Sequence, residues 1–234
     1  NFFELAFREN AAVDNQPGVA QSYNSIGKVY LAVGDIDTAE RSFQSAYDIA
    51  TRLRDNRLLL QSATNLGEAS LRRGDTDLAM RFFEQARERR DEQSDPADLA
   101  VLYHNIGTAQ SRMGEFGAAE ESLRRAQTIN TEIGQLIELA ANHYMLASVY
   151  SRQNRLDQAL SEALRALELD KQIENSVGIA ADLKALGLIS RKAGDLESAY
   201  DYLKRSLYVV AAVGLSGEAP GVLESLEELA RELG

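Results

Sequence analysis

The sequence predicts an all-α fold, a right-handed α-α superhelix (solenoid) of helix-turn-helix repeats. Three sets of small residues recur with a period of 40 residues, and we call each set a column. The columns are Gly27, Gly67, Gly107, Ala147 and Gly187; Gly34, Gly74, Gly114, Asn154, Gly194 and Gly234; and Ala39, Ala79, Ala119, Ala159 and Ala199. A fixed period of this length indicates stacked repeats, each of which contacts only its neighbours. We therefore expect an extended surface rather than one globular core with a single pocket.

Apolar residues recur at helical spacing on both sides of Gly34, which predicts two antiparallel helices in each repeat. The first repeat shows them as Tyr23, Ile26, Val29 and Tyr30, then Ile36, Ala39, Phe43, Ala46 and Ile49. Gly34 can adopt the left-handed backbone that ends one helix, and Asp35 can cap the next. Asn154 replaces Gly in the fourth repeat, and Asn tolerates that conformation best among the other residues.

The expected elements form a single array over residues 1–234, beginning with a lone second helix of a partial repeat at 1–11. Five helix pairs follow at 17–53, 57–91, 96–133, 136–173 and 176–213, and a capping helix follows at 218–233. First helices are expected near 17–33, 57–73, 96–113, 136–153 and 176–193, and second helices near 36–53, 76–91, 116–133, 156–173 and 196–213. We expect Gly27 to face Ala39, because helices approach closely only where one presents little side chain.

The two ends of the array differ in this prediction. Glu227 occupies the Gly column of the last helix, where a following second helix would bury its carboxylate without a partner, so we expect no such helix. The segment at 1–11 lacks its first helix, so Phe2, Phe3 and Phe7 would lack part of their cover. More repeats or a second subunit are expected before residue 1, and these three residues are the candidates for self-association.

Composition excludes several classes of function. The formal net charge is −11 and the isoelectric point is about 4.8, which disfavours nucleic-acid partners. No apolar run approaches the roughly 20 residues that span a bilayer, so no membrane insertion is expected. The absence of Cys excludes disulfides, thiol catalysis and thiolate metal sites. We expect a soluble protein of the cytoplasm or a bacterial periplasm, between which the sequence does not decide.

No constellation of residues predicts catalysis, a metal site or a cofactor. The two His residues, His104 and His143, have no plausible triad or ligand partners at helical spacing. Glycines fall at helix ends and crossings rather than in a phosphate-binding loop. Paired carboxylates such as Glu120-Glu121 are typical of helix faces that are exposed to solvent. We therefore expect a protein that is not an enzyme.

The sequence resembles the tetratricopeptide repeat family. The small and aromatic positions of that family are matched by Tyr23, Ile26, Gly27, Tyr30, Ala39, Phe43 and Ala46. The resemblance covers nearly the whole chain. It departs in length, since the common repeat has about 34 residues, and in lacking the usual Pro at the repeat boundary. Similar longer repeats occur in kinesin light chains, Pins-type polarity adaptors and bacterial signalling regulators. The resemblance implies a protein-protein interaction module that binds a peptide or protein segment in a concave groove lined by first helices.

Carried onto this chain, the resemblance implies a set of groove residues. They are Asn24, Lys28, Asn65, Arg72, His104, Asn105, Arg112, Tyr144, Arg152, Lys184, Arg191 and Lys192. Arg72, Arg112, Arg152 and Lys192 recur with the period, and such a basic column would attract an acidic peptide. The alternative is that each cation stabilises the C-terminal end of its own helix.

Further alternatives stay open at this stage. Asn65 and Asn105 resemble Asn residues that hold ligand backbone amides, but each could instead satisfy a neighbouring helix. The Lys and Asn set of the carboxylate clamp of chaperone-binding members is not reproduced, so chaperone C-termini are disfavoured. The chain could also be a self-associating scaffold that forms a homodimer, or the regulatory arm of a larger signalling protein.

Overall fold

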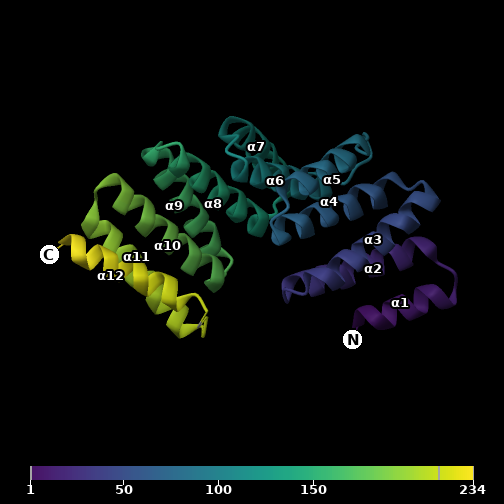
Figure 1. Ribbon diagram of the computed structural model, residues 1–234, viewed down its shortest axis with the longest axis horizontal. Coiled ribbons are helices and arrows are strands. Elements are labelled where there is room, and N and C mark those ends of the chain that lie inside the picture. Colours follow the sequence, from purple (N-terminus) through teal and green to yellow (C-terminus); the bar gives the residue numbers. More distant parts are fainter. Residues whose placement is uncertain (1, 216, 234) are drawn as a thin grey trace. The chain divides into compact units, whose positions relative to one another are not determined.

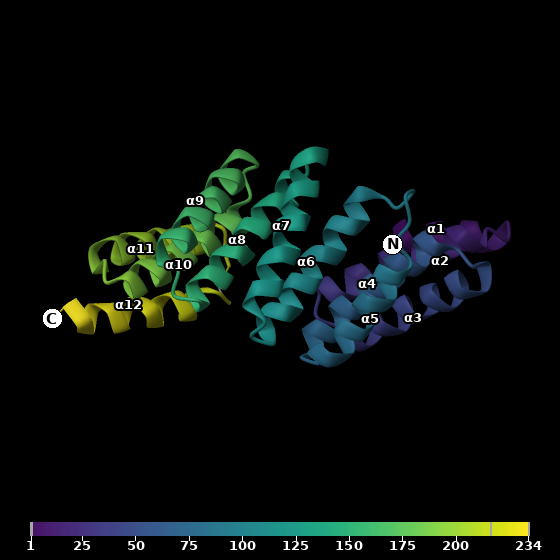
Figure 2. The ribbon, with the colours of Figure 1, turned by 90° about the horizontal axis from the view of Figure 1, so that it is seen from above.

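In the computed structural model, the described part of the chain comprises residues 2–215 and 217–233, without the side chains of residues 2–4, 6, 7 and 233. This part contains twelve α-helices and no strand (Figures 1 and 2). They are α1 (Phe2–Ala12), α2 (Gln16–Ala32), α3 (Ile36–Leu53), α4 (Asn56–Arg73), α5 (Thr76–Glu88), α6 (Pro96–Arg112), α7 (Phe116–Ile133), α8 (Leu136–Arg152), α9 (Leu156–Gln172), α10 (Ser176–Ala193), α11 (Leu196–Ala212) and α12 (Ala219–Leu233). The all-α class of helix-turn-helix repeats is therefore confirmed.

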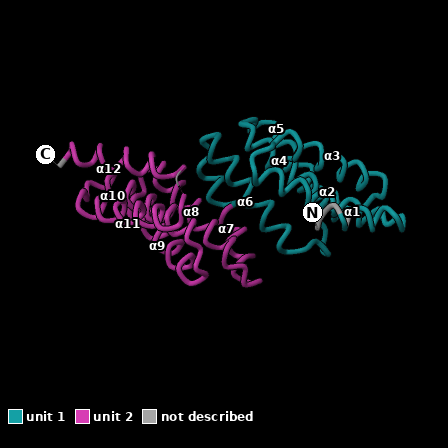
Figure 3. Tube along the Cα trace, turned by 90° about the horizontal axis from the view of Figure 1, so that it is seen from below, with its two compact units in different colours: residues 1–122 teal, residues 123–234 magenta. Residues whose placement is uncertain are grey.

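The contacts divide the chain into two compact units, residues 1–122 and residues 123–234, with the boundary inside α7 (Figure 3). In the first unit each helix from α1 to α6 packs against the next, and α2, α4 and α6 also contact one another in sequence. In the second unit the same holds from α8 to α12, with additional contacts of α10 to α8 and α12. The first helices of each unit therefore form a layer of their own. A single array over the whole chain stays a prediction.

Residues with a left-handed backbone conformation end the helices in two columns, and the sequence predicted one of these columns. Gly34, Gly74, Gly114, Asn154 and Gly194 have φ between 61° and 94°, as the Gly column predicts. A second left-handed column joins consecutive repeats and consists of Asp14, Arg54, Gly134, Glu174 and Gly214. This column is hard to recognise in the sequence because non-Gly residues occupy three of its positions. Carboxylate or amide side chains then cap the next helices, for example Asp35, which accepts from Thr38 N at 3.1 Å.

The prediction of a second helix at 76–91 is wrong at its C-terminal end, because α5 ends at Glu88. The loop that follows is closed by its own side chains: Asp91 Oδ1 accepts from Gln93 N at 2.9 Å, and Ser94 Oγ accepts from Asp91 N at 2.9 Å. Such local bonds compete with helical ones. Pro96 then restricts Asp95 to an extended backbone, with φ −61° and ψ 124°. Ser94 accordingly lacks the left-handed conformation of its column.

Gly27 and Gly67 make room for aromatic rings, a contact that the sequence did not predict, and the pairing of Gly27 with Ala39 stays a prediction. A Cβ at Gly27 would lie 2.4 Å from Cε1 of Phe43, and one at Gly67 would lie 2.3 Å from Cε1 of Phe83. Both rings are fully buried. The small residue therefore lets the second helix place a large side chain at the crossing within a repeat.

The Ala columns fill the core at closely packed positions. Ala39, Ala79, Ala119, Ala159 and Ala199 are fully buried. Between repeats, Ala46, Ile49 and Ala50 of α3 form one cluster with Leu58 and Leu59 of α4. Each repeat is therefore completed by the first helix of the next repeat, as stacked repeats require.

α12 packs on α11 and α10 in the place of a further first helix. The side chain of Glu227 is 70% exposed and lies 3.8 Å from Arg231, so the Gly-column position of α12 carries a solvated carboxylate. The side chains of Phe2, Phe3 and Phe7 lie outside the described part of the structure. Self-association through them stays a prediction.

Candidate interaction surfaces on the first helices

A hollow of about 300 Å³ lies on the first helices of the first unit, and we call it the first hollow. α2, α4 and α6 line it with Gln21, Asn24, Ser25, Lys28, Leu60, Gln61, Thr64, Asn65, Asp98 and Val101. The hollow brings together three of the predicted groove residues, Asn24, Lys28 and Asn65. Its lining is mostly amides and hydroxyls, which suit hydrogen bonding to a polar ligand.

The first hollow carries charges of both signs. Lys28 is exposed, whereas Asp98 is partly buried and accepts a hydrogen bond from Gln61 Nε2 at 2.7 Å. Burial raises the pKa of Asp98, against the opposing effect of the Gln61 bond. The hollow therefore offers a cation and a carboxyl group side by side in its lining, and its charge alone favours neither sign of ligand. Sequence reasoning missed Asp98 and Gln61, which lie outside the groove positions implied by the resemblance.

Two amide side chains meet across consecutive repeats at the floor of the first hollow. Asn65 Nδ2 donates to Asn24 Oδ1 at 3.0 Å, and both residues are buried. This contact fits the alternative in which Asn65 satisfies a neighbouring helix. The Nδ2 groups of Asn24 and Asn105 are buried without a hydrogen-bond partner among the described residues. A buried donor without a partner costs free energy, and such groups often mark a site where an acceptor binds.

A second hollow of about 300 Å³ lies on the first helices of the second unit. α8 and α10, with the residue before α12, line it with Tyr144, Ser148, Ser151, Arg152, Ala181, Lys184, Ala185, Leu188, Ile189 and Glu218. The predicted groove residues Tyr144, Arg152 and Lys184 meet here. Tyr144 is 37% exposed and Leu188 is 41% exposed, so the hollow also offers apolar contact area.

The lining of the second hollow includes two cations, one carboxylate and the phenol of Tyr144, whose pKa is shifted by its surroundings. Burial raises the pKa of Tyr144, and the negative charges of Asp182 and Glu218 raise it further. The phenol is therefore a neutral hydrogen-bond donor at neutral pH. Arg152 and Lys184 give the hollow an excess of positive lining charge over Glu218.

Two members of the predicted basic column, Arg112 and Lys192, contact the preceding repeat. Arg112 Nη1 donates to the backbone carbonyl of Leu71 in the last turn of α4, and Lys192 Nζ donates to that of Ser151 in the last turn of α8. These cations bond carbonyls at the end of the preceding first helix, which also accept from the backbone N–H groups of Gly74 and Asn154, so they do more than stabilise the end of their own helix. A carbonyl partner leaves the positive charge unneutralised, and Arg112 and Lys192 are exposed. Arg72 differs, because Glu68 lies 3.6 Å from its guanidinium on the same helix.

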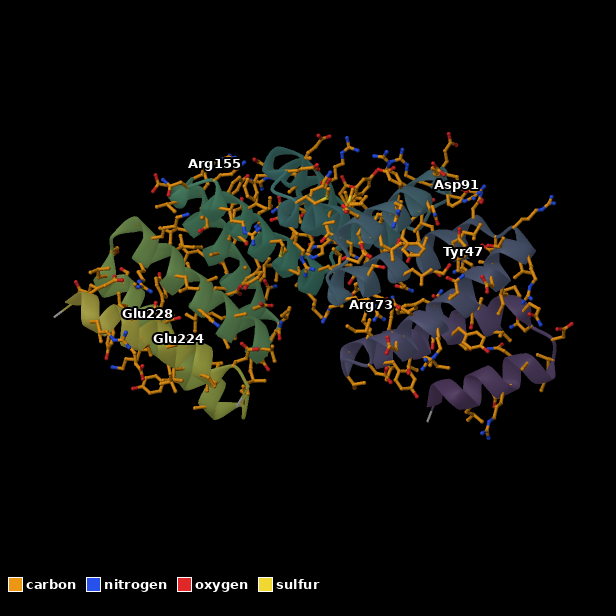
Figure 4. All side chains as sticks on the ribbon, viewed as in Figure 1. Tyr47, Arg73, Asp91, Arg155, Glu224 and Glu228 are labelled. Carbon is orange, nitrogen blue, oxygen red and sulfur yellow. The ribbon has the colours of Figure 1, made fainter. Side chains whose placement is uncertain are left out.

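Two other arginines join helices through carboxylates. Arg191 pairs with Glu228 at 2.7 Å and with Glu232, so this predicted groove residue holds α12 against α10. Arg73, which the sequence reasoning did not single out, bonds Asp37 at 2.6 Å and Glu40 at 2.7 Å on α3. Figure 4 labels Arg73 at the C-terminal end of α4 and Glu228 on α12.

The two His residues have different surroundings. His104, a predicted groove residue on α6, is partly buried, and burial lowers its pKa to about 4. His143 lies in a buried network, in which its Nδ1 is 2.5 Å from Glu162 Oε2 and Arg124 Nη2 donates to Glu162 Oε1 at 2.8 Å. Burial raises the pKa of Glu162, but the bond to His143 and the charge of Arg124 hold it below the ordinary value. This network joins α7, α8 and α9 within the second unit.

The described residues contain no group of three or more His, Cys, Asp or Glu side chains that could hold a metal ion. Within the same residues, no helix has the length and apolar character that crossing a membrane requires.

Comparison with known proteins identifies the repeat. A family model described as "Tetratricopeptide repeat" matches residues 18–92, 59–132, 98–172 and 138–210. No curated protein matches the chain.

Among solved structures, BtubC (BKLC) from P. vanneervenii is similar at 21% identity and a TM-score of 0.76, covering 91% of this chain and 88% of that one. The apo form of RapI is similar at 14% identity and a TM-score of 0.75, covering 91% of this chain and 81% of that one. A Podosopora anserina putative kinesin light chain with TPR-like repeats is similar at 17% identity and a TM-score of 0.67, covering 85% and 97%. At these identities the likeness shows the fold.

Proposed function

The chain belongs to the tetratricopeptide repeat family, and on that premise we propose that its first helices dock a peptide segment, with acidic residues of the ligand held in the second hollow. Repeats of this family generally form non-catalytic interaction modules, and the fold supports a protein-interaction scaffold. The proposal adds the place of docking and the sign of the ligand's charge.

The observation that carries the proposal is the lining of the second hollow. Arg152 and Lys184 supply two cations, Tyr144 supplies a neutral phenol donor, and Leu188 supplies apolar surface. Arg can bind a carboxylate through two parallel bonds, and a Lys ammonium adds a point charge. A Glu or Asp side chain of the ligand fits this set, while the Tyr144 ring and the Leu188 side chain bury its neighbours.

The first hollow supports binding of the ligand backbone rather than of a charge. The Asn24 Nδ2 group, buried without a described partner, can donate to a peptide carbonyl after a small side-chain rotation. Lys28 and Asp98 balance each other there. We therefore assign the acidic preference to the second unit.

Binding of degenerate acidic and basic peptide libraries of equal length, measured by fluorescence anisotropy, tests the proposal. We expect the full chain to prefer the acidic library and the double variant Arg152→Glu/Lys184→Glu to lose at least about tenfold in affinity, or about 1.4 kcal/mol. The matched control, Lys204→Glu/Arg205→Glu, makes the same charge change at exposed positions of α11, outside the hollow. An equal loss in both variants, or a preference for the basic library, would overturn the acidic preference.

A further inference from the structure

Two carboxylic acids meet in the interior of the second unit, where α9 passes to α10. Asp170 lies in the last turn of α9 and is 5% exposed, and Asp182 lies on α10 and is 2% exposed. The two side chains are in hydrogen-bonding contact, and Oδ2 of Asp182 is buried without a partner among the described residues. Two ionised carboxylates both only accept hydrogen bonds, so this contact requires a proton on one of them.

The preceding repeat builds the same junction from amides. Asn130 and Asn142 stand 40 residues before Asp170 and Asp182, and they are 2% and 0% exposed. Asn130 Nδ2 donates to Asn142 Oδ1 at 2.7 Å. An amide pair supplies its own donor at every pH, whereas a carboxyl pair supplies one only while it keeps its proton. The amide pair thus joins one donor to one acceptor, and the α9–α10 junction can make the same match only with a titratable proton.

The neighbours of Asp170 favour its ionised form. Asn175 Nδ2 donates to Asp170 Oδ1 at 3.0 Å, and a Cβ at Gly178 would lie 1.8 Å from Asp170 Oδ2. Asp170 is therefore pressed against the first turn of α10, where the helix dipole favours a negative charge. This arrangement assigns the charge to Asp170 and the proton to Asp182.

Among the described residues, no cation acts on Asp182 from the elements packed on α10. The phenol of Tyr144, on α8, interacts with the Asp182 carboxyl, and α11 contributes the Ser206 hydroxyl, which donates to Ala180 O at 2.8 Å. Lys184, on α10 itself, directs its ammonium toward Gly221 at the start of α12. Burial, reinforced by the adjacent Asp170 carboxyl, raises the pKa of Asp182 from 3.8 to about 8.

We propose that the Asp170–Asp182 pair is a proton-dependent contact that holds α9 to α10 while it keeps one proton and loosens this junction when the proton leaves in mildly alkaline solution. The loosening affects α10, which carries Lys184 and Leu188 of the second hollow. The contact itself does not depend on any ligand, so it stands or falls separately from the proposed function.

The sign of the pH dependence follows from proton counting. A carboxyl whose pKa is raised on folding binds more protons in the folded state between its two pKa values. The free energy of unfolding therefore falls as the pH rises from about 4 to about 8, and this contribution is constant above that range.

A carbon-13 NMR titration of the carboxyl groups in the unmodified full chain tests the proton directly. We expect the Asp182 resonance to titrate near pH 8, well above the ordinary range of Asp near pH 4. Titration of Asp182 below about pH 5 overturns the proposal. This measurement needs no variant and so does not depend on how a variant folds.

Hydrogen exchange of the α9 and α10 backbone amides between pH 5 and 9.5, corrected for intrinsic rates, tests the loosening. Between about pH 5 and pH 8 we expect the parent to lose up to about tenfold in protection per pH unit and then to stay constant. Asp182→Asn, which restores a permanent donor, should show no such loss. Asp201→Asn is the matched control and should behave as the parent. The same pH profile in all three chains overturns the proposal. If Asp182→Asn folds poorly, Asp170→Asn/Asp182→Asn reproduces the amide pair of the preceding repeat and replaces it.

Discussion

Substitution of Gly67 by Ala probes the packing of a small residue against an aromatic ring, which the first two repeats share. The added Cβ would lie 2.3 Å from Cε1 and 2.6 Å from Cδ1 of Phe83, whose ring is fully buried. Ordinary contacts of this kind are about 3.5 to 4 Å, so the ring or the helix must move by roughly 1 Å. Overpacking of this kind costs about 1 to 3 kcal/mol, and the better helix propensity of Ala returns at most about 1 kcal/mol. We expect a net loss of about 1 to 2 kcal/mol.

Gly117→Ala is the matched control, because Gly117 lies in α7, is exposed and has no atom within 4 Å of a built Cβ. It should leave stability unchanged or raise it by up to about 1 kcal/mol. Urea unfolding followed by far-ultraviolet circular dichroism compares the midpoints of the two variants with the parent. The packing argument is refuted if Gly67→Ala stabilises the chain as much as Gly117→Ala does.

The fourth repeat suggests a second arm of this experiment. It has Ala147 in the Gly column and Ala163 in the column of Phe83, so the larger residue on one helix accompanies a smaller one on the other. Phe83→Ala alone should cost about 3 to 5 kcal/mol. In that background Gly67→Ala meets no ring and should no longer destabilise, which gives a coupling of about 1 kcal/mol or more. Purely additive losses contradict the argument.

Three further predictions concern the polar contacts. Arg191→Ala removes the ion pairs to α12 and should lower overall stability little, because the Glu228 and Glu232 carboxylates are exposed. Faster hydrogen exchange confined to α12 supports this, and unchanged exchange contradicts it. Glu162→Gln leaves Arg124 and His143 without their carboxylate and should cost about 2 kcal/mol in urea unfolding; a loss within error of zero contradicts the assigned role. Burial lowers the pKa of His104 from its ordinary 6.5 to about 4 in the folded state. Its contribution to the free energy of unfolding is therefore fully present above pH 6.5 and is lost as the pH falls toward 4. The melting temperature of the parent should therefore fall more than that of His104→Gln over this range.

The repeating columns made most of the fold predictable. A period of 40 residues placed the helices and the left-handed Gly and Asn turns, since these depend on local chemistry. The end of α5 could not be placed, because the Asp91 and Ser94 bonds that stop it form only in the folded loop. The partner of Gly27 was missed for a related reason: spacing shows which residue is small, but only the crossing geometry shows that Phe43 fills the space.

The candidate site was predictable in part. Groove positions implied by the resemblance led to Asn24, Lys28 and Asn65 in one hollow, and to Tyr144, Arg152 and Lys184 in the other. The bonds of Arg112 and Lys192 to carbonyls of the preceding repeat link residues 41 positions apart, and nothing in one helix reveals them. The Asp170–Asp182 pair could have been noticed as the acidic counterpart of Asn130 and Asn142 once the register was extended to those columns.

Chemical-shift mapping of the isotope-labelled full chain with acidic peptides tests whether the first helices of the second unit dock a peptide. We expect backbone resonances of α8 and α10 around the second hollow, such as those of Ser148, Lys184 and Leu188, to shift on titration. Resonances on the opposite faces of α9 and α11 should stay in place. Shifts confined to α9 and α11, or no shifts at saturating peptide, would contradict the claim that the first helices of this unit form the docking surface.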